Sequence, residues 1–271
     1  MTAFSFALRD LPRQRLDVSA LTPDRLSGLS RDRIAAIELS SGNRRLRVGD
    51  LFDLSGDDVA DLRFEGSCGR LDRIGAGMTG GRVTVAGDAG DYLGLAMAGG
   101  RIEVEGGCGS HAACGLRGGV IHVRGSVGDF LGSALVGELH GMRGGTVLVG
   151  GDAGDRAGDR MRRGMLLIEG NAGDYCASRL TAGTIVVLGN VGASPGVAMV
   201  RGTLLAGALK HGLLPTFNDC GEHALGFLNL LQRSWQGLPG GFGQSPAIPG
   251  RVRRYMGDLG NGGRGEILLP A

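Results

Sequence analysis

The sequence lacks several features that would indicate common classes of function. Lys210 is the single lysine among 29 basic residues, and the formal net charge is only +2, which argues against dedicated nucleic-acid binding. No apolar run is long enough to span a membrane, and the N-terminus lacks the apolar core of a signal peptide. The five cysteines are odd in number and without paired spacing, which predicts reduced thiols. We therefore expect a cytoplasmic protein with no membrane and no nucleic-acid partner.

Glycine, in contrast, is abundant and regularly spaced. The chain has 54 glycines in 271 residues, and they punctuate a repeat between Leu62 and Ala206. Apolar residues at i and i+2, first seen at Val83 and Val85, recur in steps of 19 residues with a single step of 26. The later pairs are Ile102 and Val104, Ile121 and Val123, Val147 and Val149, Leu166 and Ile168, Ile185 and Val187, and Leu204 and Ala206. This alternation predicts short strands that place both side chains on one face.

A glycine signature follows each of these strands, as at Gly87 and Gly90 or Gly151 and Gly154. A period of 19 residues is too short for a helical repeat or a propeller blade and fits one coil of a parallel β-solenoid. Residues one period apart should then lie above one another, about 4.8 Å apart. We expect the glycines to supply positive φ angles and close backbone approach at the corners. Short polar residues should hydrogen-bond the turn backbone, in a column of Ser67, Asp88, Ser126, Asp152, Asn171 and Asn190.

The two open ends of such an array need covers. We predict an N-terminal capping segment over residues 1–61, glycine-rich coils over 62–208, and a C-terminal helix with an extended tail over 209–271. In the first segment, Phe4, Phe6 and Leu8 predict a strand, Thr22 and Pro23 begin a short helix, and residues 33–48 form a hairpin. In the last, residues 222–236 predict a helix with Leu225, Leu228, Leu231 and Trp235 on one side.

Two departures from the repeat suggest surfaces for interaction. The fourth coil is 26 residues long because of an insertion around Leu135, Val136, Gly137, Glu138, Leu139 and His140. Insertions in such repeats form outside loops, often on the face used for binding. The next coil carries Arg156, Arg160, Arg162 and Arg163. Either these arginines form a salt-bridged exterior, or they contact an acidic partner or an anionic ligand.

Outward strand positions also change along the chain. Early coils show Arg82, Thr84, Arg101 and Glu103, as a solvated face should. Later ones show Leu148, Leu167, Val186 and Leu205, an apolar stripe that needs a cover. The cover could come from the chain's own C-terminal segment or from another protein of the same assembly.

Residues with catalytic or metal-binding chemistry do not form a recognisable pattern. Cys108, His111 and Cys114 could ligate a soft metal, but a second ligand pair of the usual spacing is missing, and Cys176 fits a packing column. The five histidines fall at unrelated column positions, which argues against a nucleophilic triad. The aspartates at Asp91, Asp129, Asp155 and Asp174 fit turn hydrogen bonding better than acid–base work, because stacked like charges repel. No Walker pattern is present. We expect no catalytic, cofactor-binding or metal site on this chain.

Several segments resemble a known family. These are the run from Gly151 to Gly164, the long fourth coil, the LLPTF segment from Leu213 to Phe217, and a closing set of residues, Gly257, Asp258, Gly262, Gly263, Gly265 and Glu266. Together they resemble the C subunit of formylmethanofuran dehydrogenase. The repeat is also similar to the C-terminal domain of glutamate synthase large subunits. The resemblance implies an all-β fold, a right-handed parallel β-helix of about seven coils.

The family resemblance implies a scaffold subunit. Of its two versions, the nearly lysine-free composition favours the bacterial formyltransferase/hydrolase complex, which moves a formyl group from tetrahydromethanopterin to a methanofuran-type carrier and releases formate. Zinc-dependent hydrolysis then belongs to the A subunit and formyl transfer to the D subunit, with A, B and D as partners. The alternatives are the C subunit of a molybdenum or tungsten formylmethanofuran dehydrogenase, or a solenoid acyltransferase. The candidate interface comprises Leu135, Val136, Glu138, Leu139, His140, Arg156, Arg160, Arg162, Arg163, Leu148, Leu167, Val186 and Leu205.

Overall fold

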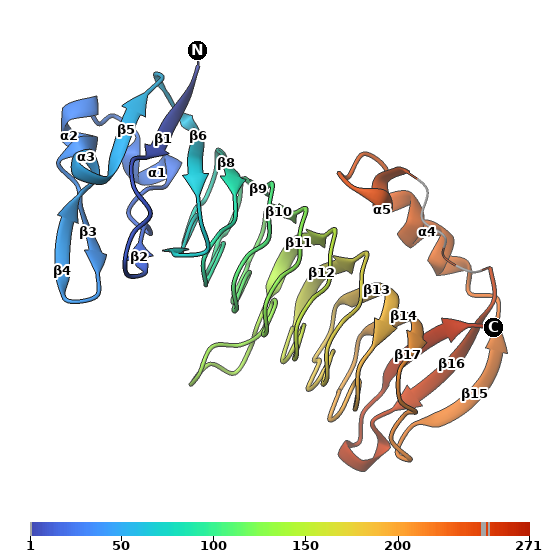
Figure 1. The fold of residues 1–271 in the computed structure, drawn as a ribbon. Coiled ribbons are helices and arrows are strands. Elements are labelled where there is room, and N and C mark those ends of the chain that lie inside the picture. Colours follow the sequence, from blue (N-terminus) through green and yellow to red (C-terminus); the bar gives the residue numbers. More distant parts are fainter. Residues whose placement is uncertain (1, 245–247, 249) are drawn as a thin grey trace.

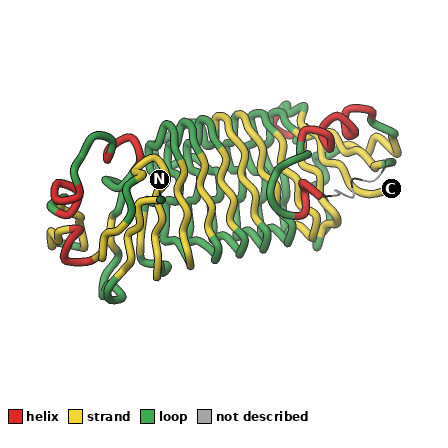
Figure 2. Tube along the Cα trace, turned by 90° about the horizontal axis from the view of Figure 1, so that it is seen from above, coloured by secondary structure: helices red, strands yellow, loops and turns green. Residues whose placement is uncertain are grey.

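The computed structural model describes residues 2–244, 248 and 250–271 and is mostly β. One sheet has 13 strands in the order β15-β16-β17-β14-β13-β12-β11-β10-β9-β8-β6-β1-β5, and a second has four in the order β4-β3-β2-β7. The large sheet runs the length of the molecule, with loops closing each repeat beside it (Figures 1 and 2). Among the described residues, the helices are all too short or too polar to cross a membrane.

The repeats contribute eight strands that pair in chain order, each parallel to the next. They are β6 (Asp58–Ser67), β8 (Arg82–Gly87), β9 (Arg101–Val104), β10 (Val120–Val123), β11 (Arg143–Val149), β12 (Arg163–Ile168), β13 (Thr184–Val191) and β14 (Thr203–Leu209). Their register confirms the expected stacking: Val104 lies opposite Val123, and Ile121 lies opposite both Ile102 and Val147. All of the predicted pairs are buried. A second line of parallel bridges joins Ala89, Cys108, Val127, Ala153, Ala172 and Val191.

Short polar side chains tie each repeat to the next. The Asp155 N–H donates to Oδ1 of Asp129 (2.8 Å), and the Asp174 N–H donates to Oδ1 of Asp155 (2.8 Å). The column of short polar residues that begins at Ser67 and ends at Asn190 also joins successive repeats. The Asn171 N–H donates to Oδ1 of Asp152 (2.7 Å), and the Asn190 N–H donates to Oδ1 of Asn171 (2.9 Å). The expected hydrogen bonds to backbone are therefore present, but they join successive repeats and do not close local turns.

These ladders explain the glycine signature. A Cβ placed on Gly154 would collide with Oδ1 of Asp129, and one on Gly173 would collide with Oδ1 of Asp155. Close approach is thus confirmed as a reason for glycine. The expectation of positive φ is wrong for most signature glycines and holds instead at the glycine that ends each coil, such as Gly119 (φ 88°). At one corner, non-glycine residues adopt the left-handed conformation, among them Tyr92 and His111 (φ 61° and 62°).

The N-terminal segment covers one end of the stack. Its elements are β1 (Ala3–Leu8), β2 (Leu16–Asp17), α1 (Pro23–Leu26), α2 (Arg31–Ala35), β3 (Glu38–Ser41), β4 (Arg44–Arg47), α3 (Val48–Leu51) and β5 (Phe52–Ser55). The short strand β7 (Leu71–Asp72), in the first repeat, pairs parallel with β2. The predicted strand at Phe4 is β1, which pairs parallel with β6 and antiparallel with β5. Phe6 stacks on Phe64 with ring centroids 5.2 Å apart. The predicted hairpin begins only at Glu38, because the residues from Arg31 to Ala35 form α2.

The C-terminal segment extends the sheet and crosses its outer face. Its elements are β15 (Asn218–His223), α4 (Gly226–Ser234), α5 (Gly241–Gln244), β16 (Val252–Gly257), the 3-10 helix η1 (Leu259–Asn261) and β17 (Gly265–Pro270). β17 pairs parallel with β14, and β16 and β15 follow antiparallel. The predicted helix is therefore shorter than residues 222–236, and the predicted extended tail contains two strands of the main sheet. The sequence also predicts a glycine- and proline-rich linker over residues 237–250, part of which lies outside the described residues. The three segment boundaries stay predictions.

We expect the carboxylate ladder to stabilise the stack through its acceptor oxygen. Asp155→Ala removes the acceptor for the Asp174 N–H and should lower the free energy of unfolding by about 0.5–1.5 kcal/mol. Asp155→Asn keeps a carbonyl oxygen in the same place and should cost clearly less. Urea unfolding of both variants measures the difference. Equal losses would show that the negative charge matters and the hydrogen bond does not.

Candidate interaction surface

The insertion in the fourth repeat is an exposed loop between β10 and β11. It projects beyond the neighbouring turns at that edge of the stack (Figure 1). Val136 is fully exposed and Leu139 is 74% exposed, whereas Leu135 and His140 are half-buried at the base of the loop. The loop is anchored to the next repeat, because the Gly141 N–H donates to the Arg160 carbonyl (2.9 Å). It therefore presents two apolar side chains on a fixed base.

The four predicted arginines have different roles. Arg156 lies over the ring of Tyr175, with its guanidinium carbon 4.7 Å from the centroid. The Arg160 guanidinium donates to the Glu138 carbonyl of the insertion loop (3.3 Å). Arg162 and Arg163 are exposed and make no side-chain hydrogen bond or ion pair with the rest of the described chain. The loop and Arg160 are thus brought together as the sequence suggested, while Arg156 belongs to a column of flat side chains.

That column runs along the corner with left-handed backbone. Tyr92 stacks on His111 with centroids 5.0 Å apart, and His111 stacks on Phe130 with centroids 4.8 Å apart. Such conformations are unfavourable for bulky residues. Ring stacking between successive repeats offsets part of that cost. His111 is therefore held between two rings.

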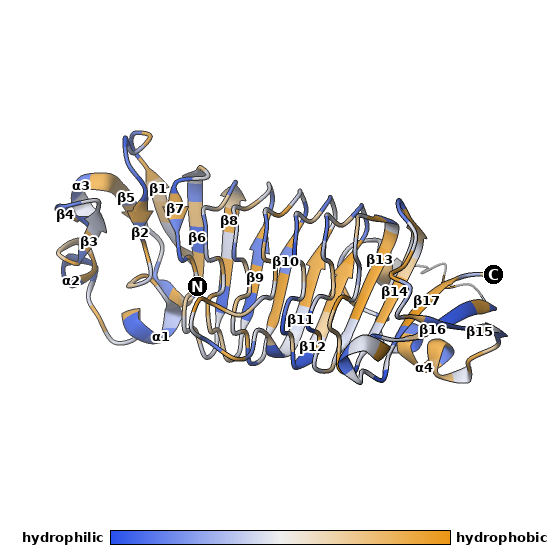
Figure 3. Ribbon diagram, turned by 90° about the horizontal axis from the view of Figure 1, so that it is seen from below, coloured by the Kyte–Doolittle hydropathy of each residue, from blue (hydrophilic) through white to orange (hydrophobic). Residues whose placement is uncertain are grey.

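The apolar stripe is covered by the chain's own C-terminal segment. Leu148, Leu167, Val186 and Leu205 are all at most 3% exposed. They pack in one cluster with Leu228 and Trp235 of the α4 region, Phe242 of α5, Val252 and Leu268. The indole N–H of Trp235 donates to the Met165 sulfur (2.9 Å), and the Gly241 N–H donates to Glu169 Oε1 (2.5 Å). Figure 3 shows the apolar character of the strand faces increasing from β9 to β14.

Of the two covers that the sequence allowed, the chain's own C-terminal segment is therefore the one present. A partner would reach these four stripe residues only through α4 and α5, and their role in an interface between subunits stays a prediction. The outer side of α4 is itself apolar, with Phe227 41% exposed and Leu230 65% exposed. This second face was not predicted from the sequence, because the helical pattern was fitted only to the residues on one side.

The buried thiols are poorly suited to chemistry. Burial raises the pKa of the Cys114 thiol to about 11 and that of Cys176 to about 12. Burial and the nearby Asp91 and Asp88 raise the pKa of Cys108 to about 12. The thiolate is the nucleophile and the metal ligand, so these shifts disfavour both roles. Within the described part of the chain, no group of three His, Cys, Asp or Glu side chains could hold a metal ion.

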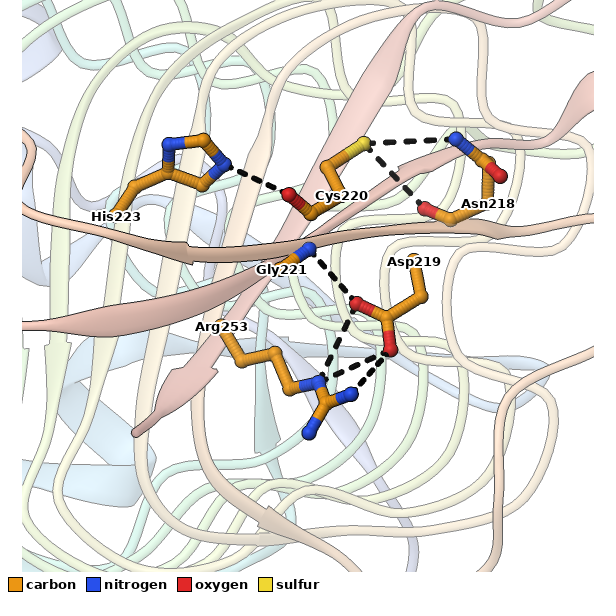
Figure 4. Close-up of polar contacts among 6 residues, drawn as sticks. All are labelled: Asn218, Asp219, Cys220, Gly221, His223 and Arg253. Carbon is orange, nitrogen blue, oxygen red and sulfur yellow. Dashed lines mark hydrogen bonds and ion pairs between the residues drawn. The ribbon is translucent and has the colours of Figure 1, made fainter.

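Polar groups also gather on the edge strand β15 (Figure 4). His223 Nε2 lies 3.0 Å from the Cys220 carbonyl oxygen, and the thiol of Cys220 faces the amide and carbonyl of Asn218. The histidine therefore does not contact the thiol. Arg253 makes a two-pronged ion pair with Asp219 (2.7 and 3.0 Å), and this pair lowers the pKa of the Asp219 carboxyl. The arrangement fixes β15 to β16 and does not form a catalytic pair.

Known proteins share both the repeat and parts of its surroundings. The model of the GXGXG motif family matches residues 82–208. The C subunit of the formyltransferase/hydrolase complex Fhc of Methylorubrum extorquens is 45% identical over 84 residues, which is 31% of this chain and 31% of that protein. The C subunit of a tungsten-containing formylmethanofuran dehydrogenase 2 of Methanococcus maripaludis is 35% identical over 80 residues, 29% of each. The aligned segments thus span less than a third of these curated relatives.

A solved structure matches almost from end to end. One chain of the crystal structure of the formyltransferase/hydrolase complex (FhcABCD) from Methylorubrum extorquens, in complex with methylofuran, is similar with a TM-score of 0.92 and 42% identity. The match covers 98% of this chain and 99% of that chain. It therefore extends beyond the repeats into the N-terminal cover and the C-terminal strands.

The cysteines of the folded protein should differ in their reactivity toward a thiol reagent, because they differ in burial. With a pKa of about 12, the thiol of Cys176 is ionised in only about one molecule in 10,000 at pH 8, and its burial blocks access as well. We expect N-ethylmaleimide to modify Cys68 and Cys220, which are half-buried, and to spare Cys114 and Cys176. Peptide mapping by mass spectrometry checks this, with urea-unfolded protein as the control in which all five react. Fast labelling of Cys176 in the folded protein would contradict the expected burial.

The C-terminal cover should depend on its buried indole. Trp235→Ala should release α4 from the stripe at a cost of about 3–5 kcal/mol, because a fully buried ring is lost. Leu230→Ala, on the exposed side of the same helix, should change stability by about 0.5 kcal/mol or less. Hydrogen exchange of α4 and of β11 to β14 compares the two variants. Equal protection in both would show that Trp235 does not hold the cover in place.

Proposed function

Since this chain belongs to the family of C subunits found in formyltransferase/hydrolase complexes and formylmethanofuran dehydrogenases, we propose that it is the structural C subunit of a formyltransferase/hydrolase complex. Its role is to hold the A, B and D subunits together. The complex would transfer the formyl group from formyl-tetrahydromethanopterin to a methanofuran-type carrier and release formate. Zinc, the carrier and the pterin belong to the other subunits in this proposal, and the complex would work in the cytoplasm.

The observation that carries this proposal is the end-to-end match to a chain of the formyltransferase/hydrolase complex. A match limited to the glycine repeats would support the fold alone, because such repeats recur in unrelated proteins. This match also includes the segments that cover both ends. The dehydrogenase alternative has weaker support, since the tungsten-containing relative is 35% identical over its aligned segment against 45% for the bacterial one.

The side-chain chemistry agrees with a role in assembly. The interior columns are filled by apolar residues, and the thiols among them have raised pKa values. Among the described residues, four of the eight exposed large apolar side chains lie on the insertion loop and on α4, where a partner could bury them. We also infer that the stack is a right-handed parallel β-helix. The parallel order of β6 to β14 and the second line of bridges support this fold, and an experimental map with left-handed connections would contradict it.

Purification of the tagged chain from its native host tests the proposal. We expect three other subunits to elute with it at a constant ratio, and we expect formyltransferase and formyl-carrier hydrolase activities in the same fraction. A strain without this chain should yield the catalytic subunits as separate species on gel filtration. The proposal would be wrong if the chain eluted alone while both activities appeared in a different, intact assembly.

A further inference from the structure

Three arginines form a column beside the insertion loop. Arg117, Arg143 and Arg162 occupy the same position in consecutive repeats, directly after the buried Leu116, Met142 and Met161. The Arg143 N–H donates to the Leu116 carbonyl, and the Arg162 N–H donates to the Met142 carbonyl. Each arginine backbone therefore lies about 4.8 Å above the last. All three side chains are exposed.

The positive charge of this column is poorly balanced. Arg143 makes an ion pair with Glu138 (3.6 Å), whereas Arg117 and Arg162 make none with the rest of the described chain. Elsewhere the same fold neutralises its stacked charges, since Arg15 pairs with both Asp72 and Asp91. Like charges one repeat apart repel each other. Although the net charge of the chain is only +2, three arginines gather here, and Glu138 is the one acidic residue that the described chain pairs with them.

A small cavity lies between this column and the loop. It has a volume of about 110 Å³ and is lined by Arg117, Arg143, Glu138, His140, Leu135 and Cys114, among others. His140 is one of the lining residues, and its Nδ1 atom is buried and has no hydrogen-bond partner among the described residues. A buried polar atom without a partner is unfavourable. A carboxylate oxygen in the cavity could accept hydrogen bonds from either guanidinium.

Apolar anchors stand next to the charged column. Val136 and Leu139 at the loop tip are the two most exposed large apolar side chains among the described residues. Exposed apolar residues beside arginine have the composition of a protein interface. A nucleic acid would neutralise the arginines but would leave both apolar side chains in water. A protein partner with carboxylates beside an apolar patch would satisfy both sets of residues.

We propose that the arginine column and the insertion loop form a docking surface for an acidic segment of a partner subunit. Carboxylates of that segment pair with Arg117 and Arg162, and one carboxylate enters the cavity beside Arg143 and His140. Val136 and Leu139 bury against apolar residues of the same partner. This inference rests on the proposed function and identifies the surface and the kind of partner segment through which this subunit joins the complex.

The test uses the assembled complex and a variant that leaves Val136 and Leu139 of the insertion loop unchanged. Arg117→Gln with Arg162→Gln removes two exposed charges and keeps the Arg143–Glu138 pair. The matched control is Arg44→Gln with Arg45→Gln, two exposed arginines of β4. We expect the first variant to bind the other subunits about 10- to 100-fold more weakly at low salt, and to lose most of the salt dependence of binding. The control should bind like the wild-type chain.

A second variant tests the apolar part. Val136→Ser with Leu139→Ser should weaken binding by about 10-fold at both low and high salt, because burial of apolar surface is not screened. Circular dichroism melts establish that all variants are folded. The inference is overturned if the wild-type complex forms and the arginine variant binds and responds to salt like its control. It is also overturned if the arginine variant loses only bound nucleic acid. A wild-type chain that binds none of the other subunits would overturn the proposed function as well.

Discussion

The structure depends on hydrogen bonding between repeats that lie in strict register. Each strand from β8 to β13 forms backbone hydrogen bonds with the strand before it and the strand after it. Residues 19 apart, or 26 apart between β10 and β11, are therefore fixed above one another. Side chains reinforce the register, because the oxygen of one aspartate accepts the N–H of the next repeat, as between Asp155 and Asp174. The oxygen occupies the space where a side chain would sit on Gly173, so that position must be glycine.

This constraint determines where function can be placed. The interior of each coil is filled by the apolar columns, and a change of length inside a strand would break the register on both sides. Extra residues are tolerated only where a coil turns, which is where the insertion around Val136 leaves the stack. Variation is also tolerated on the outward strand positions, where Thr84 and Glu103 give way to Leu148 and Leu167. Interaction surfaces therefore form on the sides of the stack.

The sequence predicts the register well because every column repeats a chemical type. Val83, Ile102 and Ile121 could be placed above one another before the structure was known, and the strand pairing confirms that placement. The reason for the signature glycines was harder to see, since it depends on the direction of an aspartate side chain in the neighbouring repeat. The strands β16 and β17 were missed because their residues lie outside the period and pair antiparallel with each other. The column of Arg117 and Arg162 was readable in the repeat, but the denser cluster of arginines near Arg160 concealed it.

The two ends of the stack show why partners should approach from the side. A parallel array with bare ends would add further copies strand by strand. At the N-terminal end the edge strand β5 runs antiparallel to β1, and at the C-terminal end β15 runs antiparallel to β16. β15 carries Asp219 and Glu222, both exposed, and Asp219 is held by Arg253. Charged, antiparallel edges oppose end-to-end growth, and the exposed apolar residues of the loop and of α4 lie on the sides of the stack, where they are available for assembly.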